Sequence, residues 1–315
     1  MNPINSRNGT HHSNETVLAQ LAVRKANLDQ SQLAISTGKR INKVSDDPVG
    51  AAQAERSMIR IERIKVEMRA MDLQRSNLTL AESTLGEGIE YLQRVRELLV
   101  TAGNAALDTP QRVGIANEIE GLRNRLLQIA NRQDSNGMAL FGGLGSVAIP
   151  FEEDGAGIVS FKGVAGLAAQ SDVSLPMALD GQSAFMFATS ADPSASTSIF
   201  HALDKAIVDL QKPLTNAAES AAMNAAIIQG LKDTDRGLSQ LQAVRGRAGE
   251  FLNQSDLIEI QLNARHDQSE ADRSRVQDLD MAQGISQMQS NQVAYEIALK
   301  SYAQSQQLSL FNFLK

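Results

Sequence analysis

Residues 278–315 read DLDMAQGISQMQSNQVAYEIALKSYAQSQQLSLFNFLK. Large side chains recur in this stretch at alternating steps of four and three residues, which is the spacing of one face of an α-helix. The stripe consists of Met281, Ile285, Met288, Gln292, Tyr295, Leu299, Tyr302 and Gln306. A helix with a single narrow apolar stripe is only marginally stable in water by itself. The segment therefore predicts a helix that needs a partner.

The opposite end of the chain carries a comparable stripe. Its apolar members are Leu18, Leu21, Leu28 and Ile35, and Lys25 and Gln32 interrupt it. Neither terminal segment has a second apolar face, so neither can complete a core by itself. We therefore favour packing between copies of the chain over an internal core for these two stripes.

A longer helical pattern follows the N-terminal stripe. Asp46-Asp47-Pro48 offers an Asp N-cap and a Pro at the first helical position, where its missing N–H costs nothing. The seam that begins there has a period near 3.5, which suits helices packed almost parallel in a bundle. Its apolar members are Ile64, Met68, Met71, Leu78, Leu85, Ile89, Leu92 and Leu99, and Arg75, Glu82 and Arg96 fill the remaining positions. We expect an intramolecular core along this seam.

Three further helices are predicted between the ends. Asp108-Thr109-Pro110 repeats the capping device before a helix whose stripe ends at Ile129. A short amphipathic helix runs from Phe200 to Leu210, and Pro213 stops it. A longer helix follows, with Leu231, Leu238, Leu241, Ala248 and Leu252 on its seam.

The centre of the chain has a different composition. Nine of the 22 glycines and five of the nine phenylalanines lie between residues 137 and 187. The β-prone runs 147–152 and 157–162 flank a turn at 153–156, and residues 171–175 and 183–188 could add strands. The fold class is therefore mainly α with a β-rich insert (α+β). A chain that leaves the helical part and returns to it makes distant segments share one bundle.

The composition excludes several functions. The chain has no cysteine, which excludes disulfides, thiolate metal sites and cysteine nucleophiles. Its 30 basic and 36 acidic side chains give a net charge of −6, the wrong sign for a general binder of nucleic acid or anionic membranes. No apolar run approaches the roughly 20 residues of a membrane span. Residues 1–15 also lack the basic and apolar regions of a secretory signal peptide.

No segment has the pattern of an active site. His11-His12 lacks further metal ligands, and His201 and His266 fit a helix surface. The acidic run 152–154 lacks the alternating ligands of a calcium loop, and the glycine-rich run 142–146 leads into a β-prone run rather than a helix. Arg236, Arg245 and Arg247 are interspersed with acids and fit a solvated or inter-subunit polar face. We assign no catalytic, cofactor-binding or metal-binding residue.

Stretches at both ends resemble the bacterial flagellin family. Residues 35–52, ISTGKRINKVSDDPVGAA, resemble the family's N-terminal signature, which here includes Arg40, Ile41, Asn42, Asp46, Asp47 and Pro48. Residues 92–104, LQRVRELLVTAGN, resemble the helix that follows, and residues 278–315 resemble the family's C-terminal helix. The matches occur in the family's order and cover both helical flanks, while the insert matches only loosely.

Three details resemble the junction proteins of this family. Pro48 stands where flagellins commonly have Ala. Residues 129–143, IANRQDSNGMALFGG, are similar to the entry into a junction protein's middle domain, and residues 309–314, SLFNFL, are similar to its C-terminal close.

The resemblance implies a domain organisation. In the family the two terminal helices pair as a coiled coil, which here gives residues 1–42 with 278–315. Residues 43–136 with 199–277 would form a helical bundle, and residues 137–198 would form the inserted β-rich domain. In the assembled state we expect Ile285, Met288, Tyr295, Leu299, Tyr302 and Leu308 to pack against Leu18, Leu21, Leu28 and Ile35.

The resemblance also implies a function. It indicates a structural subunit of the bacterial flagellum, not an enzyme, that joins the hook to the flagellin filament. The implied partners are other copies in a ring, a hook-associated protein on the hook side, flagellin on the filament side and a cytoplasmic export chaperone, with no nucleic acid, membrane or cofactor. The implied location is extracellular, after export through the flagellar apparatus without a cleaved signal peptide. The alternatives are a flagellin proper and, in another class, a cytoplasmic coiled-coil scaffold.

Overall fold

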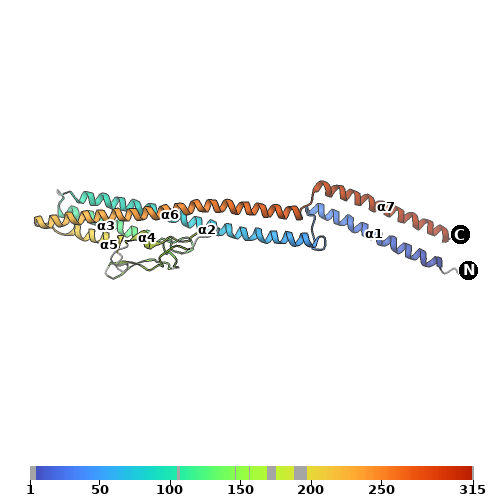
Figure 1. Cartoon of the computed structure of the whole chain (residues 1–315), viewed down its shortest axis with the longest axis horizontal. Helices are drawn as coiled ribbons and strands as arrows, with labels where there is room; N and C mark the ends of the chain where they lie inside the picture. Colours follow the sequence, from blue (N-terminus) through green and yellow to red (C-terminus); the bar gives the residue numbers. More distant parts are fainter. Residues whose placement is uncertain are drawn as a thin grey trace. The chain divides into compact units, whose positions relative to one another are not determined.

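The computed structural model describes residues 5–313 except 105–106, 146, 156, 169–174 and 188–196, and describes side chains from residue 15 to residue 304 other than Thr197. Seven helices and four short strands lie in this described part (Figure 1). The chain divides into two compact units, Met1–Lys65 with Asn263–Lys315, and Val66–Leu262. The first unit contains both terminal helices, and the second contains most of the core.

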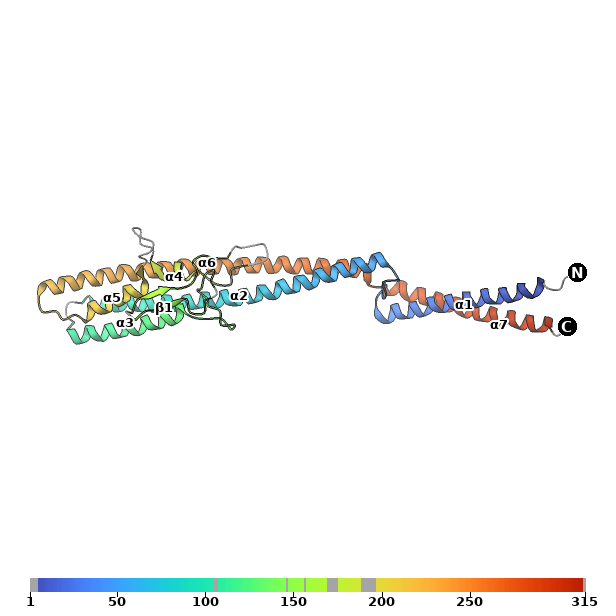
Figure 2. The same cartoon turned by 90° about the horizontal axis from the view of Figure 1, so that it is seen from below.

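Four helices form the bundle of the second unit. Helices α2 (Pro48–Ala102) and α6 (Ala217–Gln277) pass through it, and α3 (Thr109–Ala130) packs against α5 (Ile199–Gln211). Figures 1 and 2 both show α3 and α5 lying along α2 and α6 in this unit. Leu78, Leu85, Leu92 and Leu99, at every seventh position of α2, are at most 1% exposed. The predicted core along this seam is therefore confirmed.

The helix ends follow the predicted signals. Asp108 and Gln111 form a capping box at the start of α3, in which the Gln111 N–H donates to Asp108 Oδ1 at 2.9 Å and the Asp108 N–H donates to Gln111 Oε1 at 3.1 Å. Helix α5 starts after Ser198, whose Oγ accepts the His201 N–H, and ends two residues before Pro213. The predicted start of α3 and the predicted end of α5 are both confirmed.

The charged positions of the α2 seam form ion pairs with α6. The pairs are Arg75 with Asp256 and Glu259, Glu82 with Arg245, and Arg96 with Asp235, at N–O distances of 2.7–2.9 Å. The residue numbers of the partners on α6 fall as the residue numbers on α2 rise, so the two helices run antiparallel. Each pair is partly exposed, so each contributes about 0–1 kcal/mol.

The insert consists of two small antiparallel pairs and one short helix. Strands β1 (Phe151–Glu153) and β2 (Val159–Phe161) pair with Phe151 opposite Phe161, which confirms the predicted hairpin. Strand β3 (Met186–Phe187) pairs with β4 (Thr197–Ser198). The expectation of a strand over 183–188 is wrong for residues 183–185, which belong to helix α4 (Gly181–Phe185), because Asp180 caps this helix through the Gln182 N–H. Of the other expected strand, residues 171–174 fall outside the described residues.

Aromatic side chains join the insert to the bundle. Phe141, Phe151, Phe185 and Phe200 are each at most 1% exposed. The Phe185 ring lies 5.4 Å from Phe141, 5.2 Å from Phe151 and 6.0 Å from Phe200, measured between centroids. Since Phe200 belongs to α5 and Phe151 to β1, this cluster holds the hairpin and α4 against the helices.

A buried arginine makes a second connection. The Arg123 side chain on α3 is only 5% exposed and pairs with Glu153 of β1 at 2.8 Å and with Asp204 of α5 at 3.0 Å. Burial raises the pKa of Asp204, against the opposing effect of the guanidinium. Three elements distant in sequence therefore meet at one guanidinium, whose planar shape suits two carboxylates.

Asp134 organises the turn that leads from α3 into the insert. Its Oδ1 accepts the N–H groups of Asn136 at 2.8 Å and Met138 at 2.9 Å, and its Oδ2 accepts the Asn77 amide of α2 at 3.0 Å. Burial of this carboxyl opposes ionisation, but the three donors outweigh it and hold the pKa of Asp134 below its usual range. The carboxylate form is therefore the one that stabilises this turn.

We expect Asp134→Asn to lower the free energy of unfolding by about 1–2 kcal/mol at pH 7, because charge-assisted hydrogen bonds become neutral ones. A carboxyl with a lowered native pKa contributes stability above its unfolded value of about 3.9 and loses it as the pH falls through the native value. The difference between wild type and variant should therefore shrink below about pH 4. Urea unfolding between pH 3 and pH 7 measures it, and a constant difference across that range would contradict the assignment. Asp72→Asn, which changes an exposed carboxyl on α2, is the control, and we expect it to change the free energy of unfolding by less than about 0.5 kcal/mol.

Candidate functional site

The two terminal helices lie side by side in the first unit. Helix α1 (Asn5–Thr37) and helix α7 (Met281–Phe313) pack against each other, and the two views agree that they run antiparallel (Figures 1 and 2). The expected pairing of the N- and C-terminal helices is therefore confirmed, and it forms within one chain. The packing between copies that the two stripes favoured stays a prediction. Half-buried side chains recur at every seventh position on both helices. They are Leu21, Leu28 and Ile35 on α1, and Met288, Tyr295 and Tyr302 on α7.

Three other residues of the expected contact lie at its margin. Leu18 is 49% exposed, Ile285 is 43% exposed and Leu299 is 40% exposed. Met281, on the same stripe of α7, is 45% exposed. Leu308 falls outside the residues whose side chains the structure describes. Helix α1 therefore covers one edge of the α7 stripe and leaves the other edge in water.

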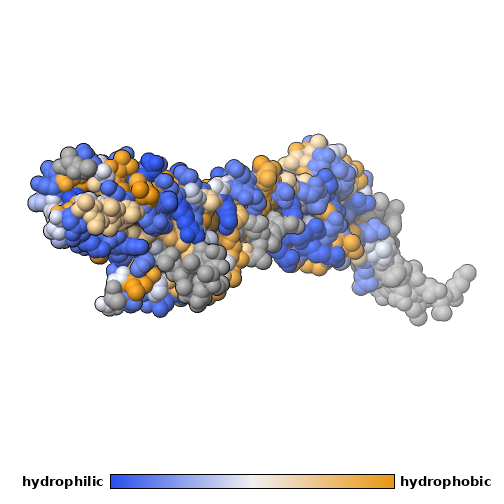
Figure 3. Space-filling view, turned by 60° about the vertical axis from the view of Figure 1, so that its left-hand side comes forward, coloured by the Kyte–Doolittle hydropathy of each residue, from blue (hydrophilic) through white to orange (hydrophobic). Residues whose placement is uncertain are grey.

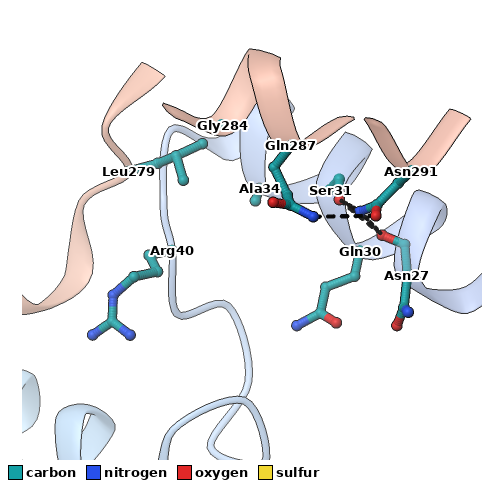
Figure 4. Close-up of a pocket in the computed structure, with 9 residues that line it drawn as sticks. All are labelled: Asn27, Gln30, Ser31, Ala34, Arg40, Leu279, Gly284, Gln287 and Asn291. Carbon is teal, nitrogen blue, oxygen red and sulfur yellow. Dashed lines mark hydrogen bonds between the residues drawn. The ribbon is translucent and has the colours of Figure 1, made fainter. Parts of the chain in front are cut away.

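The contact between the helices also contains a polar cluster, which the sequence pattern did not single out. The Asn291 amide of α7 donates to Ser31 Oγ at 2.7 Å and to the Asn27 carbonyl at 3.4 Å, both on α1 (Figure 4). These groups line a cleft of about 280 Å³ that extends to Arg40 and Leu279. The sequence did offer one signal for this cluster. Asn291 is a polar residue directly beside the α7 stripe, next to its member Gln292.

A second groove runs between the same two helices, farther from the connecting segments. It has a volume of about 420 Å³. Its lining is Val17, Gln20, Leu21 and Arg24 from α1 with Ala294, Ile297, Ala298 and Ser301 from α7. The small side chains of Ala294 and Ala298 leave this space open.

The segments that connect the terminal helices to α2 and α6 bind each other through their backbones. The Leu279 N–H donates to the Gly38 carbonyl at 2.9 Å, and Lys39 forms a β-bridge with Asp278. Gly38 has a φ of +67°, which favours glycine at the end of α1. We call residues 38–47 the N-terminal connector and residues 278–280 the C-terminal connector. The two connectors therefore form one structure although about 240 residues separate them in the chain.

The motif residues of the N-terminal connector shape this structure. Asp46 Oδ2 accepts the N–H groups of Asn42 and Lys43, and the Asn42 amide donates to the Lys39 carbonyl at 2.9 Å. Ile41 is buried, with 5% of its surface exposed. These bonds fold residues 39–46 into a compact turn before α2.

Asp47 and Pro48 begin α2. Asp47 Oδ1 accepts the Gly50 N–H at 2.9 Å, and this bond, followed by the Arg40 guanidinium, lowers the pKa of Asp47. Gly50 gives room for this close approach, since a Cβ there would lie 2.5 Å from Asp47 Oδ2 and 2.6 Å from Ile41 Cδ1, and one of these side chains would have to shift. The small residue after the cap is therefore part of the same arrangement.

The other candidate residues from the sequence lie apart from this site. The side chains of His11 and His12 fall outside the described part, His201 is exposed, and His266 lies beside Asp267. Among the described residues no three acidic, histidine or cysteine side chains are grouped so that they could hold a metal ion. Arg245 pairs with Glu82, and Arg236 lies 4.9 Å from the Phe187 ring. No helix in the described part is long and apolar enough to span a bilayer.

Comparison with known proteins identifies relatives along most of the chain. Residues 10–146 match the model of the bacterial flagellin N-terminal helical region, and residues 231–314 match that of the C-terminal helical region. Flagellar hook-associated protein 3 of Escherichia coli K12 is 31% identical over 89% of this chain and 91% of its own length. Flagellin of Bacillus subtilis is 27% identical over 87% of each chain.

Solved structures agree with the fold. The crystal structure of flagellar hook-associated protein 3 from Legionella pneumophila has a TM-score of 0.63 at 22% identity and covers 70% of this chain and 97% of its own. FlgL from Xanthomonas campestris has a TM-score of 0.60 at 17% identity and covers 69% of this chain and 98% of its own. Both support the mainly helical architecture.

Proposed function

The chain belongs to the bacterial flagellin family, in the group of flagellar hook-associated protein 3, and we propose that it is the structural subunit that joins hook to filament in a bacterial flagellum. The observation that carries the proposal is the 31% identity to the Escherichia coli protein over about nine tenths of both chains. The two flagellin regions at the ends, and the antiparallel pair that they form, support the same function.

The terminal helix pair would supply the contacts between copies. Residues of an α-helix turn by about 100° each, so Ile285 and Leu299 lie on one edge of α7 while Ala294 and Ala298 lie on the other. One edge is an exposed apolar ridge, and the other borders the open groove. Two different surfaces that fit each other make a head-to-tail contact, which closes into a ring or continues as a helix. This geometry suits a subunit of a tubular assembly.

The proposed domain roles follow from this use of the ends. Residues 1–42 with 278–315 would form the terminal layer that packs between copies, with Leu18, Leu21, Leu28 and Ile35 against Ile285, Met288, Tyr295, Leu299, Tyr302 and Leu308. Residues 43–136 with 199–277 would form the bundle, and residues 137–198 the exposed insert. The role is structural and not enzymatic.

The partners and location belong to the same proposal. The subunit would contact its own copies in a ring, a hook-associated protein on one side and flagellin on the other. It would be exported through the flagellar secretion apparatus, without a cleaved signal peptide and with help from a cytoplasmic chaperone, to a final location outside the cell. The net charge of −6 supports protein partners over nucleic acid or anionic membrane.

Fractionation of a flagellated culture tests this function against its alternatives. Immunoblots of cytoplasm, medium and sheared flagella should place the chain in the flagella, at far fewer copies than flagellin. A band as strong as the filament protein would make the chain a flagellin. Recovery from the cytoplasm alone would indicate a coiled-coil scaffold and contradict the proposal.

A further inference from the structure

The end of helix α6 is capped by groups from the other end of the chain. The last carbonyls of a helix have no partner within the helix. Here the Arg40 guanidinium donates to the Val276 carbonyl at 2.8 Å, and the Arg40 N–H donates to the Gln277 carbonyl at 2.8 Å. The positive charge also lies at the negative end of the helix dipole. The C-terminus of α6 therefore depends on a residue 236 positions away in sequence.

The same guanidinium reaches the start of helix α2. Arg40 Nη2 lies 3.2 Å from Asp47 Oδ2, while Asp47 Oδ1 accepts the Gly50 N–H at 2.9 Å. An anion is favoured at a helix N-terminus and a cation at a helix C-terminus. A single Arg–Asp pair thus supplies hydrogen-bond partners to a carbonyl at the end of α6 and to an N–H at the start of α2.

Helix α7 begins close to this pair. Only residues 278–280 separate the end of α6 from Met281, and Leu279 is bound to Gly38 through its N–H. Asp280 Oδ1 accepts the N–H groups of Ala282 and Gln283, which starts α7 directly after the connector. The end of α6 and the start of α7 are therefore joined by three residues, and the N-terminal connector binds one of them.

We propose that Arg40 is a positioning residue that couples the ordering of the N-terminal connector to that of the C-terminal connector, so that the two connectors, and the adjoining ends of the helix pair that they hold, become ordered together. The biological role of this coupling, which is to present α1 and α7 as a pair, rests on the proposed function. The coupling itself is a property of the isolated chain. It follows because a side chain of the N-terminal connector binds the last turn of α6, which leads directly into the C-terminal connector.

Hydrogen exchange on the full-length protein tests the coupling. In Arg40→Met we expect exchange to accelerate about 3- to 10-fold both in residues 40–50 and in residues 274–284, the effect of losing charge-assisted bonds at a half-exposed site. Arg40→Lys should restore part of the protection, because one ammonium reaches a single acceptor where the guanidinium reaches two. Exchange in α3 and α5 should not change.

Lys39→Met is the matched control, since it removes a positive charge one residue away. We expect wild-type exchange in this variant. Acceleration in residues 40–50 alone in Arg40→Met would show that the connectors order independently and would overturn the coupling. Equal acceleration in both variants would assign the effect to net charge and overturn it as well. The experiment uses purified protein, so a chain that never reaches the flagellum would refute the proposed function and leave this result standing.

Discussion

Replacing Ile285 and Leu299 together by Asp is expected to abolish filament growth while the protein still folds and is still exported. Both side chains are exposed in the single chain, at 43% and 40%, so carboxylates there stay in water. In the proposed assembly the same edge of α7 is buried against a neighbouring copy. Burying an unpaired charge costs several kcal/mol for each residue and in every copy of the contact.

The measurement combines swimming assays, electron microscopy of cell-attached flagella and circular dichroism of the purified variant. Val293→Asp is the matched control, because Val293 is 54% exposed on α7 and lies outside the stripe. We expect the control to swim. Motile cells that carry the double variant would refute the role of this edge, and a double variant that fails to fold would refute its exposure in the free chain.

Phe185→Ala is expected to have the largest effect on the stability of the second unit. The ring is 0% exposed and contacts three other aromatic rings that come from the insert and from α5. Removing a buried Phe side chain costs about 3–5 kcal/mol, through lost burial and the cavity left behind. Because the cluster joins the insert to the bundle, the insert should unfold first.

Urea unfolding measures this loss, and exchange of backbone amides locates it. Met177→Ala is the control, since Met177 is in the insert but 50% exposed, and we expect it to change stability by less than about 0.5 kcal/mol. A loss below about 1 kcal/mol for Phe185→Ala would show that the insert does not depend on the cluster.

The helical part of the fold could be predicted because its signals are local. Leu78, Leu85, Leu92 and Leu99 repeat every seven residues, and Asp108 with Pro110 marks a helix start within three positions. Such patterns need no knowledge of the partner helix. The paired ends could be expected from two stripes without a second apolar face together with the family resemblance.

The insert was harder to predict because its segments are short. Residues 183–185 have strand-like composition, but Asp180 caps a single helical turn there. One side-chain hydrogen bond can decide the conformation of five residues when no long apolar pattern opposes it. The hairpin at 151–161 was predictable because its turn and both strands are adjacent in sequence.

The polar contacts of the candidate site could not be predicted from the sequence. Arg40 and Val276 are 236 residues apart, and Asn291 binds Ser31 at a separation of 260. Neither pair has a spacing rule, since each depends on how two distant helices meet. The sequence identified Arg40 only as part of a family signature, and its cap on α6 became visible in three dimensions.

Gold-labelled antibody to this chain, viewed on shed flagella by electron microscopy, tests the proposed function most directly. A single band where the hook meets the filament is the expected result. Label along the whole filament would identify a flagellin instead, and flagella without label would contradict a place for this chain in the flagellum.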